Sequence, residues 1–183
     1  LYLSHFEKRK NHILLLQAFS LFIKRYPDSE VKLVLVGSGF DINLVKFFME
    51  FILKEKLEKH IHISWSIEEE DLAPLMSDCL SFLYPSLYEG FGLPALEAMQ
   101  CGAPVIASNT SSIPEVVGDA GILLSPDDVV SWMQAMGRIY ESKDLRKDLS
   151  ERSLKRASLF SWKKTVSKML EAFNCKKKTC SNV

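Results

Sequence analysis

Two glutamates, Glu89 and Glu97, lie eight positions apart on either side of a glycine-rich turn, Gly90-Phe91-Gly92. A carboxylate accepts two hydrogen bonds at once, so each glutamate suits a pair of sugar hydroxyls. Glycines allow a ligand to approach the backbone closely. The pattern therefore predicts a site for a sugar that is joined to a diphosphate.

The segment after this turn predicts a helix that begins beside the glutamates. Leu93 is followed by Pro94, which suits the first helical position, and Gly102 suits the end of the helix. Glu97 is then expected in the first turn. A helix start carries unpaired N–H groups and about half a positive charge, so it attracts an anion such as a diphosphate. The alternative is that Glu97 only complements the helix dipole, which leaves the glycine turn and Glu89 unexplained.

The rest of the chain predicts the elements that position this motif. Apolar runs typical of strands alternate with helical patterns, and this repeated β–α–β order predicts a parallel sheet with helices on both faces and right-handed crossovers. The strands are expected at 1–4, 31–37, 60–64, 80–85, 105–109 and 121–125. The helices are expected near 11–26, 42–57, 69–78, 94–101, 127–142, 144–158 and 161–173. The glutamate motif follows the fourth strand, at the sheet edge where ligands bind in such folds.

The spacing Glu89-x7-Glu97 with Gly-Phe-Gly-Leu-Pro inside it resembles the signature of retaining glycosyltransferases of the GT-B type, glycosyltransferase family 4 (group 1). Similar segments are Lys10-Asn11, Val36-Gly37-Ser38-Gly39, Pro104-Val-Ile-Ala, Ile113-Pro114-Glu115, Gly121-Ile-Leu-Leu and Phe160-Ser-Trp162. The resemblance covers only the C-terminal, donor-binding half of such an enzyme.

The resemblance implies an α/β fold, a Rossmann-like three-layer domain with a six-stranded parallel sheet and additional C-terminal helices. Residues 1–173 are expected to form the nucleotide-sugar-binding domain and residues 174–183 a polar tail. Because Leu1 stands inside an expected strand, the N-terminal acceptor domain is expected to be absent from this chain.

The resemblance also implies roles for individual residues. Glu89 is expected to be the catalytic residue and to hold the transferred hexose. Glu97 is expected to hold the ribose hydroxyls. Gly90, Phe91, Gly92 and Leu93 are expected to contact the donor. Lys10 matches a lysine that binds the diphosphate, whereas His5 and Ser4 stand where the family has arginine and glycine. Histidine is only partly charged at neutral pH, so this departure predicts weaker donor binding.

Two further segments are candidates for contact with the nucleotide. Gly37-Ser38-Gly39 lacks the third glycine and the acidic partner of a dinucleotide fingerprint, so it predicts a tight turn or a close approach to the nucleotide diphosphate. By resemblance, the backbone near Ser66 and Ile67 is expected to contact the base. His60 and His62 have no third ligand spaced with them, and no metal or other cofactor is expected.

The composition of the chain limits the classes of molecule that it is expected to bind. The 23 basic and 23 acidic residues give a formal net charge of zero, which offers no general attraction to nucleic acid or anionic lipid. No apolar stretch is long enough to cross a bilayer. By context, the expected location is the cytoplasm, and peripheral association of the intact enzyme with the cytoplasmic membrane face is left open.

The expected function is transfer of a hexose from a nucleotide-diphosphate sugar, such as GDP-mannose or a UDP-sugar, to an acceptor hydroxyl with retention. The segment Tyr-Glu-Gly-Phe-Gly-Leu-Pro resembles the corresponding segment of mannosyltransferases, and polysaccharide assembly is the expected context. The isolated chain is expected to be inactive without the acceptor half. One alternative is a catalytically degenerate nucleotide-sugar-binding module, which the His5 departure favours. Another is a related GT-B epimerase or phosphorylase.

Overall fold

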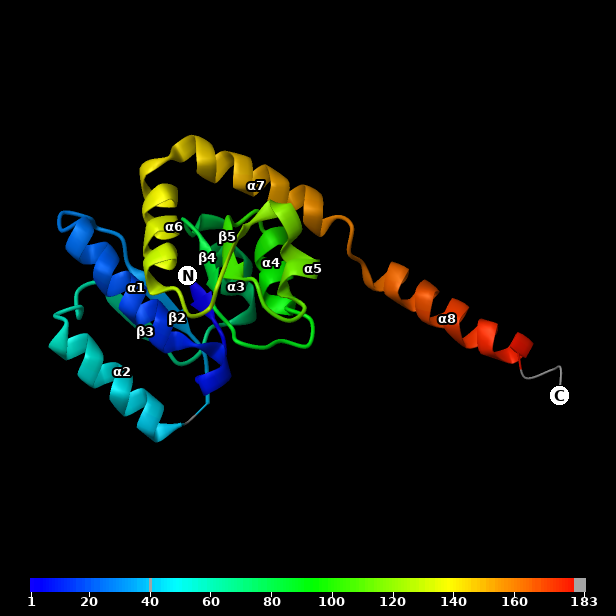
Figure 1. The fold of residues 1–183 in the computed structure, drawn as a ribbon, viewed down its shortest axis with the longest axis horizontal. Helices are drawn as coiled ribbons and strands as arrows, with labels where there is room; N and C mark the ends of the chain where they lie inside the picture. The colour runs from blue at the N-terminus through cyan, green and yellow to red at the C-terminus, as the bar shows by residue number, and fades with distance from the viewer. Residues whose placement is uncertain (40, 180–183) are drawn as a thin grey trace.

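The computed structural model describes the backbone of residues 1–39 and 41–179, and side chains within this part up to residue 173. Strands and helices alternate along the chain (Figure 1). The strands are β1 (Tyr2–Leu3), β2 (Leu33–Val36), β3 (Ile61–Ser64), β4 (Phe82–Tyr84), β5 (Val105–Ser108) and β6 (Ile122–Leu124). The helices are α1 (His12–Arg25), α2 (Ile42–Lys54), α3 (Glu69–Asp78), α4 (Leu93–Gln100), α5 (Ile113–Val117), α6 (Val129–Glu141), α7 (Lys143–Ala157) and α8 (Trp162–Thr179).

Every strand and helix predicted from the sequence has a counterpart in the structure. Helix α5 and the short 3-10 turns η1 (Lys8–Lys10) and η2 (Gly118–Ala120) were not predicted, because they are too short to show a helical period. Helix α8 runs through Thr179, into the segment that was expected to be a tail. Residues 180–183 of that expected tail lie outside the described part of the chain.

Local sequence signals explain where several helices begin. Asp41 accepts a hydrogen bond from the Leu44 N–H before α2, and Asp128 and Ser142 make the corresponding bonds before α6 and α7. Such side-chain caps each stabilise a helix by about 1 kcal/mol. The apolar sequence of β5 is consistent with its burial, because a strand that is covered on both faces needs no alternation of polar and apolar residues.

The strands form two three-stranded parallel sheets, ordered β1-β2-β3 and β4-β5-β6. The prediction of parallel strands is confirmed, but the single six-stranded sheet is split between β1 and β4. These two strands are short, and their meeting point carries the backbone bond from Leu83 N–H to the Leu1 carbonyl at 2.8 Å. The two sheets therefore adjoin side by side, and their carboxyl ends share one edge.

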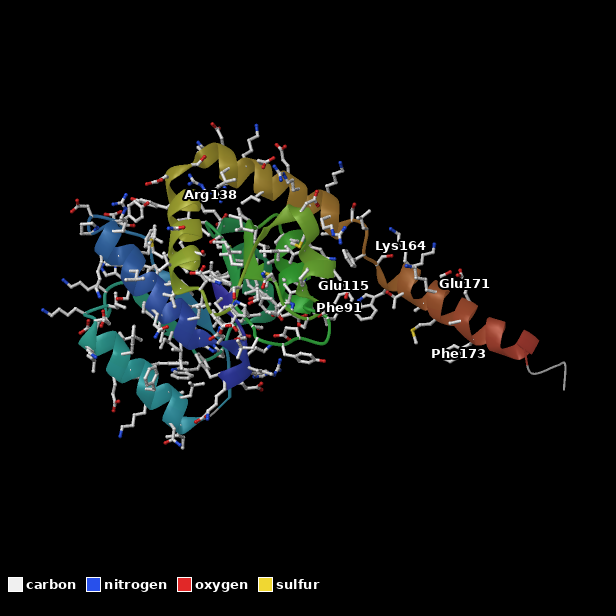
Figure 2. The ribbon with its side chains drawn as sticks, viewed as in Figure 1. Phe91, Glu115, Arg138, Lys164, Glu171 and Phe173 are labelled. Atoms are coloured by element: carbon white, nitrogen blue, oxygen red, sulfur yellow. The ribbon has the colours of Figure 1, made fainter. Side chains whose placement is uncertain are left out.

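Helix α8 extends away from the body formed by the other elements (Figures 1 and 2). Lys164, Glu171 and Phe173 lie along it, well beyond Phe91 and Arg138 of the body (Figure 2). No helix in the described part of the chain is both long and apolar enough to cross a membrane.

Gly37 allows the end of β2 to pack directly against the loop after β1. A Cβ atom at this position would lie 1.7 Å from the Ser4 carbonyl oxygen. Since the obstructing atom belongs to the backbone, it cannot rotate away. The close approach that Gly37 permits is therefore to a neighbouring loop of the protein itself.

Replacing Gly37 with alanine should therefore lower the free energy of unfolding by roughly 3 kcal/mol or more, because the clash forces the loop and strand apart. Urea unfolding measures this change. Gly90→Ala is the matched control, because a Cβ atom there meets nothing within 4 Å and should cost no more than about 0.5 kcal/mol. Equal stability of the two variants would contradict the steric role of Gly37.

His12 begins α1 and is buried among aromatic rings. Its ring lies 4.9 Å from that of Phe6 and 4.8 Å from that of Tyr2, and Nε2 is 3.2 Å from Ser4 Oγ. Burial, with a smaller contribution from the Lys10 charge, lowers the pKa of His12 to about 3. His12 is therefore neutral at neutral pH.

We expect His12 to make the protein acid-sensitive. The unfolded chain takes up a proton near the ordinary pKa of 6.5, whereas the folded protein does so only near 3. Stability is therefore lost as pH falls from about 6.5, with a slope of up to about 1.4 kcal/mol per pH unit from this residue. Unfolding measured from about pH 4 to pH 8 should show a shallower slope for His12→Phe. Parallel curves for His12→Phe and the parent would contradict the assignment.

Candidate functional site

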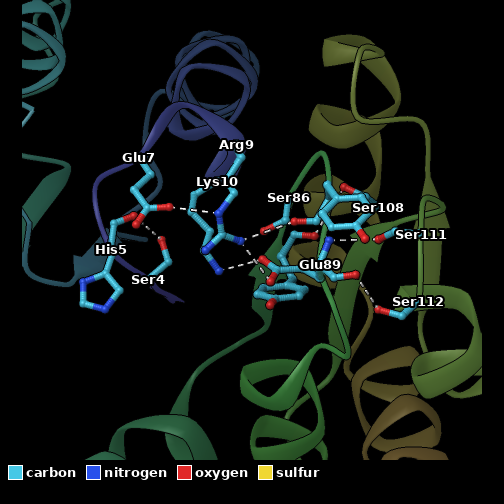
Figure 3. A network of polar contacts seen from close by, with 12 residues as sticks. Ser4, His5, Glu7, Arg9, Lys10, Ser86, Glu89, Ser108, Ser111 and Ser112 are labelled. Carbon is cyan, nitrogen blue, oxygen red and sulfur yellow. Dashed lines mark hydrogen bonds and ion pairs between the residues drawn. The ribbon is translucent and has the colours of Figure 1, made fainter.

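A buried ion pair between Lys10 and Glu89 lies at the shared carboxyl edge of the two sheets (Figure 3). Lys10 Nζ donates to Glu89 Oε1 at 2.6 Å, and the two side chains are only 8% and 10% exposed. Lys10 comes from the loop after β1 and Glu89 from the loop after β4. The pair therefore connects the first sheet to the second where ligands bind in folds of this kind.

Glu89 is held as a carboxylate by its surroundings. Burial raises the pKa of its carboxyl group, but the hydrogen bond and charge of Lys10, together with the nearby hydroxyls of Ser86 and Tyr84, outweigh this effect, so the pKa is lowered overall. Its backbone is also fixed, because the Glu89 N–H donates to Ser111 Oγ at 3.0 Å and Ser112 Oγ donates to the Glu89 carbonyl at 2.9 Å. An ionised, immobile carboxylate accepts hydrogen bonds from hydroxyl groups and does not serve as an acid at neutral pH.

Three residues that the sequence reasoning did not assign to the site lie beside this pair. Arg9 Nη1 donates to Glu89 Oε2 at 3.2 Å. The hydroxyls of Tyr84 and Ser86 are buried, and the described part of the chain gives neither of them a hydrogen-bond partner. Burial also raises the pKa of the Tyr84 phenol, which stays protonated. The available sequence signal was position alone, because Arg9 adjoins Lys10, Tyr84 ends a buried strand and Ser86 follows that strand.

Asn11 connects three loops of this edge. Its Nδ2 donates to the Pro85 carbonyl at 3.2 Å, after β4, and to the Pro126 carbonyl at 2.8 Å, after β6. Asn11 has φ of 55°, a left-handed conformation that asparagine tolerates better than most residues. It precedes α1, but its side chain does not cap the helix, because the amide instead donates to these two carbonyls.

The start of α4 follows the glycine turn directly. Gly92 has φ of 102° and precedes Leu93, the first helical residue, so a side chain at position 92 would be strained. Glu97 is then the fifth residue of α4, and its expected place in the first turn was wrong because the left-handed Gly92 starts the helix one residue early. Gly90 and Phe91 are exposed, and their N–H groups have no hydrogen-bond acceptor among the described residues.

The remaining predicted residues lie apart from the ion pair. Glu97 is exposed on α4. His5 Nδ1 lies 3.1 Å from both the carbonyl and the hydroxyl oxygen of Ser38, and its ring points away from Glu89 (Figure 3). Ser66 and Ile67 follow β3 and line an open hollow of about 530 Å³. The structure thus brings Lys10 and Glu89 into contact but gives none of these other four a hydrogen bond to them within the described part.

An apolar cavity of about 280 Å³ lies at the opposite ends of the strands, lined in part by Leu1, Leu33 and Ser81. It is separate from the charged edge. Across the described residues, no three His, Cys, Asp or Glu side chains are grouped so that they could hold a metal ion.

Comparison with known proteins gives a family match. Residues 1–156 match the family described as Glycosyl transferases group 1. The O-antigen chain mannosyltransferase B of Escherichia coli is 35% identical over 178 residues, which cover 94% of this chain and 45% of that protein. The MMP alpha-(1->4)-mannosyltransferase of Mycolicibacterium hassiacum is 36% identical over 117 residues, which cover 62% of this chain and 28% of that protein. The chain thus spans less than half the length of these relatives.

Among solved structures, the Anabaena protein HepE, described in complex with UDP and glucose, has a TM-score of 0.84 at 22% identity. The match covers 95% of this chain and 47% of that one. This likeness confirms the expected fold, one half of a GT-B architecture.

Replacing Glu89 with glutamine should destabilise the protein, because it leaves the Lys10 ammonium buried without a counter-charge. We expect a loss of about 2–4 kcal/mol in the free energy of unfolding at neutral pH, measured with urea. Because the folded pKa of Glu89 is lowered, its contribution is present above the unfolded value of 4.5 and is lost as pH falls through the folded value. The difference between parent and variant should therefore shrink in acid.

The matched control for this variant is Glu97→Gln, which removes the same charge from an exposed position. It should change the free energy of unfolding by no more than about 0.5 kcal/mol at any pH. If Glu89→Gln behaved like this control at neutral pH, the ion pair would not stabilise the fold.

Proposed function

The chain belongs to the Glycosyl transferases group 1, and from this premise we propose that it is the donor-binding half of a retaining glycosyltransferase of family 4. The proposed reaction moves a hexose from a nucleotide-diphosphate sugar to an acceptor hydroxyl. The observation that carries the proposal is the ionised Glu89, held by Lys10 next to the glycine turn and the start of α4. This arrangement offers a hydrogen-bond acceptor for a sugar beside donors and positive charge for a diphosphate.

In the proposed reaction, negative charge develops on the leaving diphosphate. Lys10, the exposed N–H groups of Gly90 and Phe91, and the positive end of α4 supply groups that stabilise such charge. Glu89 orients the hexose through its hydroxyls, and Glu97 takes the ribose hydroxyls. The proposal assigns these roles to the protein's own groups and includes no metal ion.

The proposal further specifies that the donor carries mannose. Both relatives described above are named mannosyltransferases, and they are 35% and 36% identical to this chain. GDP-mannose is therefore the first donor to test, with UDP-sugars as the comparison. Since the chain spans under half of these relatives, the acceptor site is assigned to the other half of the intact protein, and the chain alone should not turn over substrate.

A catalytically degenerate binding module is the second candidate. It is favoured by His5, which stands in the expected arginine position and contacts Ser38 instead of the ion pair. Turnover by the intact protein distinguishes the two candidates, because a binding module takes up the nucleotide sugar without releasing nucleoside diphosphate. Analysis of the anomeric configuration of any product then tests retention.

Calorimetric titration of the chain with GDP, UDP and ADP tests the donor site. Glu97→Ala should weaken binding of the preferred nucleotide by about 1–3 kcal/mol, because the ribose hydroxyls lose their acceptor. Glu151→Ala, an exposed glutamate on α7, is the control and should bind like the parent. Unchanged binding by Glu97→Ala would refute the ribose assignment.

A further inference from the structure

Arg9 is the accessible cation of the site. Its side chain is 46% exposed, whereas that of Lys10 is 8% exposed and bonded to Glu89 at 2.6 Å. A ligand approaching this edge of the sheets meets the guanidinium group of Arg9 before it meets the ammonium group of Lys10. The two cations are therefore not equivalent in what they can bind.

Part of the guanidinium group is already engaged. Arg9 Nε donates to Glu7 Oε2 at 2.9 Å, and Nη1 donates to Glu89 Oε2 at 3.2 Å and to the Tyr88 carbonyl at 3.4 Å. Nη2 has no acceptor among the described residues. Because guanidinium carries five N–H donors in a planar fork, it retains capacity for a bidentate contact with phosphate oxygens.

The charges around Arg9 determine which group must move before an anionic ligand can make such a contact. Arg9 and Lys10 contribute two positive charges, and Glu7 and Glu89 contribute two negative ones, so this cluster is neutral without ligand. An anionic ligand gains most when one carboxylate withdraws. Glu89 is buried and bonded to Lys10, whereas Glu7 is 47% exposed and, among the described residues, pairs with Arg9 alone. An exposed ion pair is screened by water and contributes little to stability, so Glu7 is the carboxylate that exchanges.

We propose that Arg9 binds the diphosphate of the nucleotide ligand, and that Glu7 occupies this face of Arg9 until the ligand displaces it. The inference rests on the proposed function, since it deepens the assignment of the same site. It also supplies the second cation that was expected at His5, whose ring contacts Ser38 and points away from Glu89 (Figure 3). Glu7 is thus an internal competitor that lowers the affinity for the ligand.

Titration of the 183-residue chain with UDP and GDP by calorimetry tests the inference. Arg9→Ala should weaken binding of the better nucleotide by roughly 10-fold or more, as expected for a lost charge-assisted contact. Glu7→Gln should tighten it by roughly 2- to 5-fold, because the competitor is removed. In the Arg9→Ala background, Glu7→Gln should have no effect on the dissociation constant.

Lys8→Ala is the matched control, because it removes the same charge from the same exposed loop. It should change the dissociation constant by no more than about twofold. An equal loss from Lys8→Ala and Arg9→Ala would show a general effect of loop charge and overturn the proposal. A larger loss from His5→Ala than from Arg9→Ala would overturn it as well.

A purely structural role of Arg9 gives a different result. If Arg9 only oriented Glu89, which is assigned to the hexose, then UDP and GDP, which carry no hexose, would bind Arg9→Ala as they bind the parent. Glu7→Gln would then fail to tighten binding, and the inference would be wrong while the proposed function stood. If the parent chain bound neither nucleotide, the proposed function itself would fail, and the inference with it.

Discussion

The buried pair of Lys10 and Glu89 is the contact on which the ligand edge of this protein depends. Its two partners lie on loops that follow strands of different sheets, and these sheets adjoin at the short strands β1 and β4. Neighbouring contacts support the same joint, because the Leu87 N–H donates to the Arg9 carbonyl at 2.8 Å and Asn11 reaches the loops after β4 and β6. A buried ion pair costs desolvation energy that an apolar pair does not, so stability alone does not account for it. What it adds is a carboxylate fixed at the edge of the site.

The charged edge holds one covered cation, Lys10, and one accessible cation, Arg9. Lys10 is covered and neutralised, which fixes Glu89 in its ionised form. Arg9 is half-exposed and bonded to a carboxylate on each side. Three residues after Glu89, Gly92 directly precedes α4 in a left-handed conformation. Acceptors for sugar hydroxyls and donors for an anion are thereby combined on two loops, each of which follows a parallel strand.

The fold was largely predictable because local sequence patterns specify its helices and strands. The apolar run of β5 and the cap residues before α2, α6 and α7 act within a few positions of the chain. The split of the sheet was not predictable in this way, because it depends on how few backbone bonds β1 and β4 form across the joint. The early start of α4 at Leu93 depends on the left-handed backbone of Gly92, which the sequence permits but does not require.

For the site, the sequence by itself determined the residue types: two glutamates around a glycine turn, and a lysine-asparagine pair after the first strand. Those signals are short motifs at fixed spacing, and they sufficed for the family. Only the tertiary structure decided that Glu89 pairs with Lys10, 79 positions away, and that Glu97 stays exposed. It also directed Arg9 toward the pair and His5 toward Ser38. The reason is physical: contacts between loops depend on where parallel strands place their ends, and no local pattern in the chain encodes that distance.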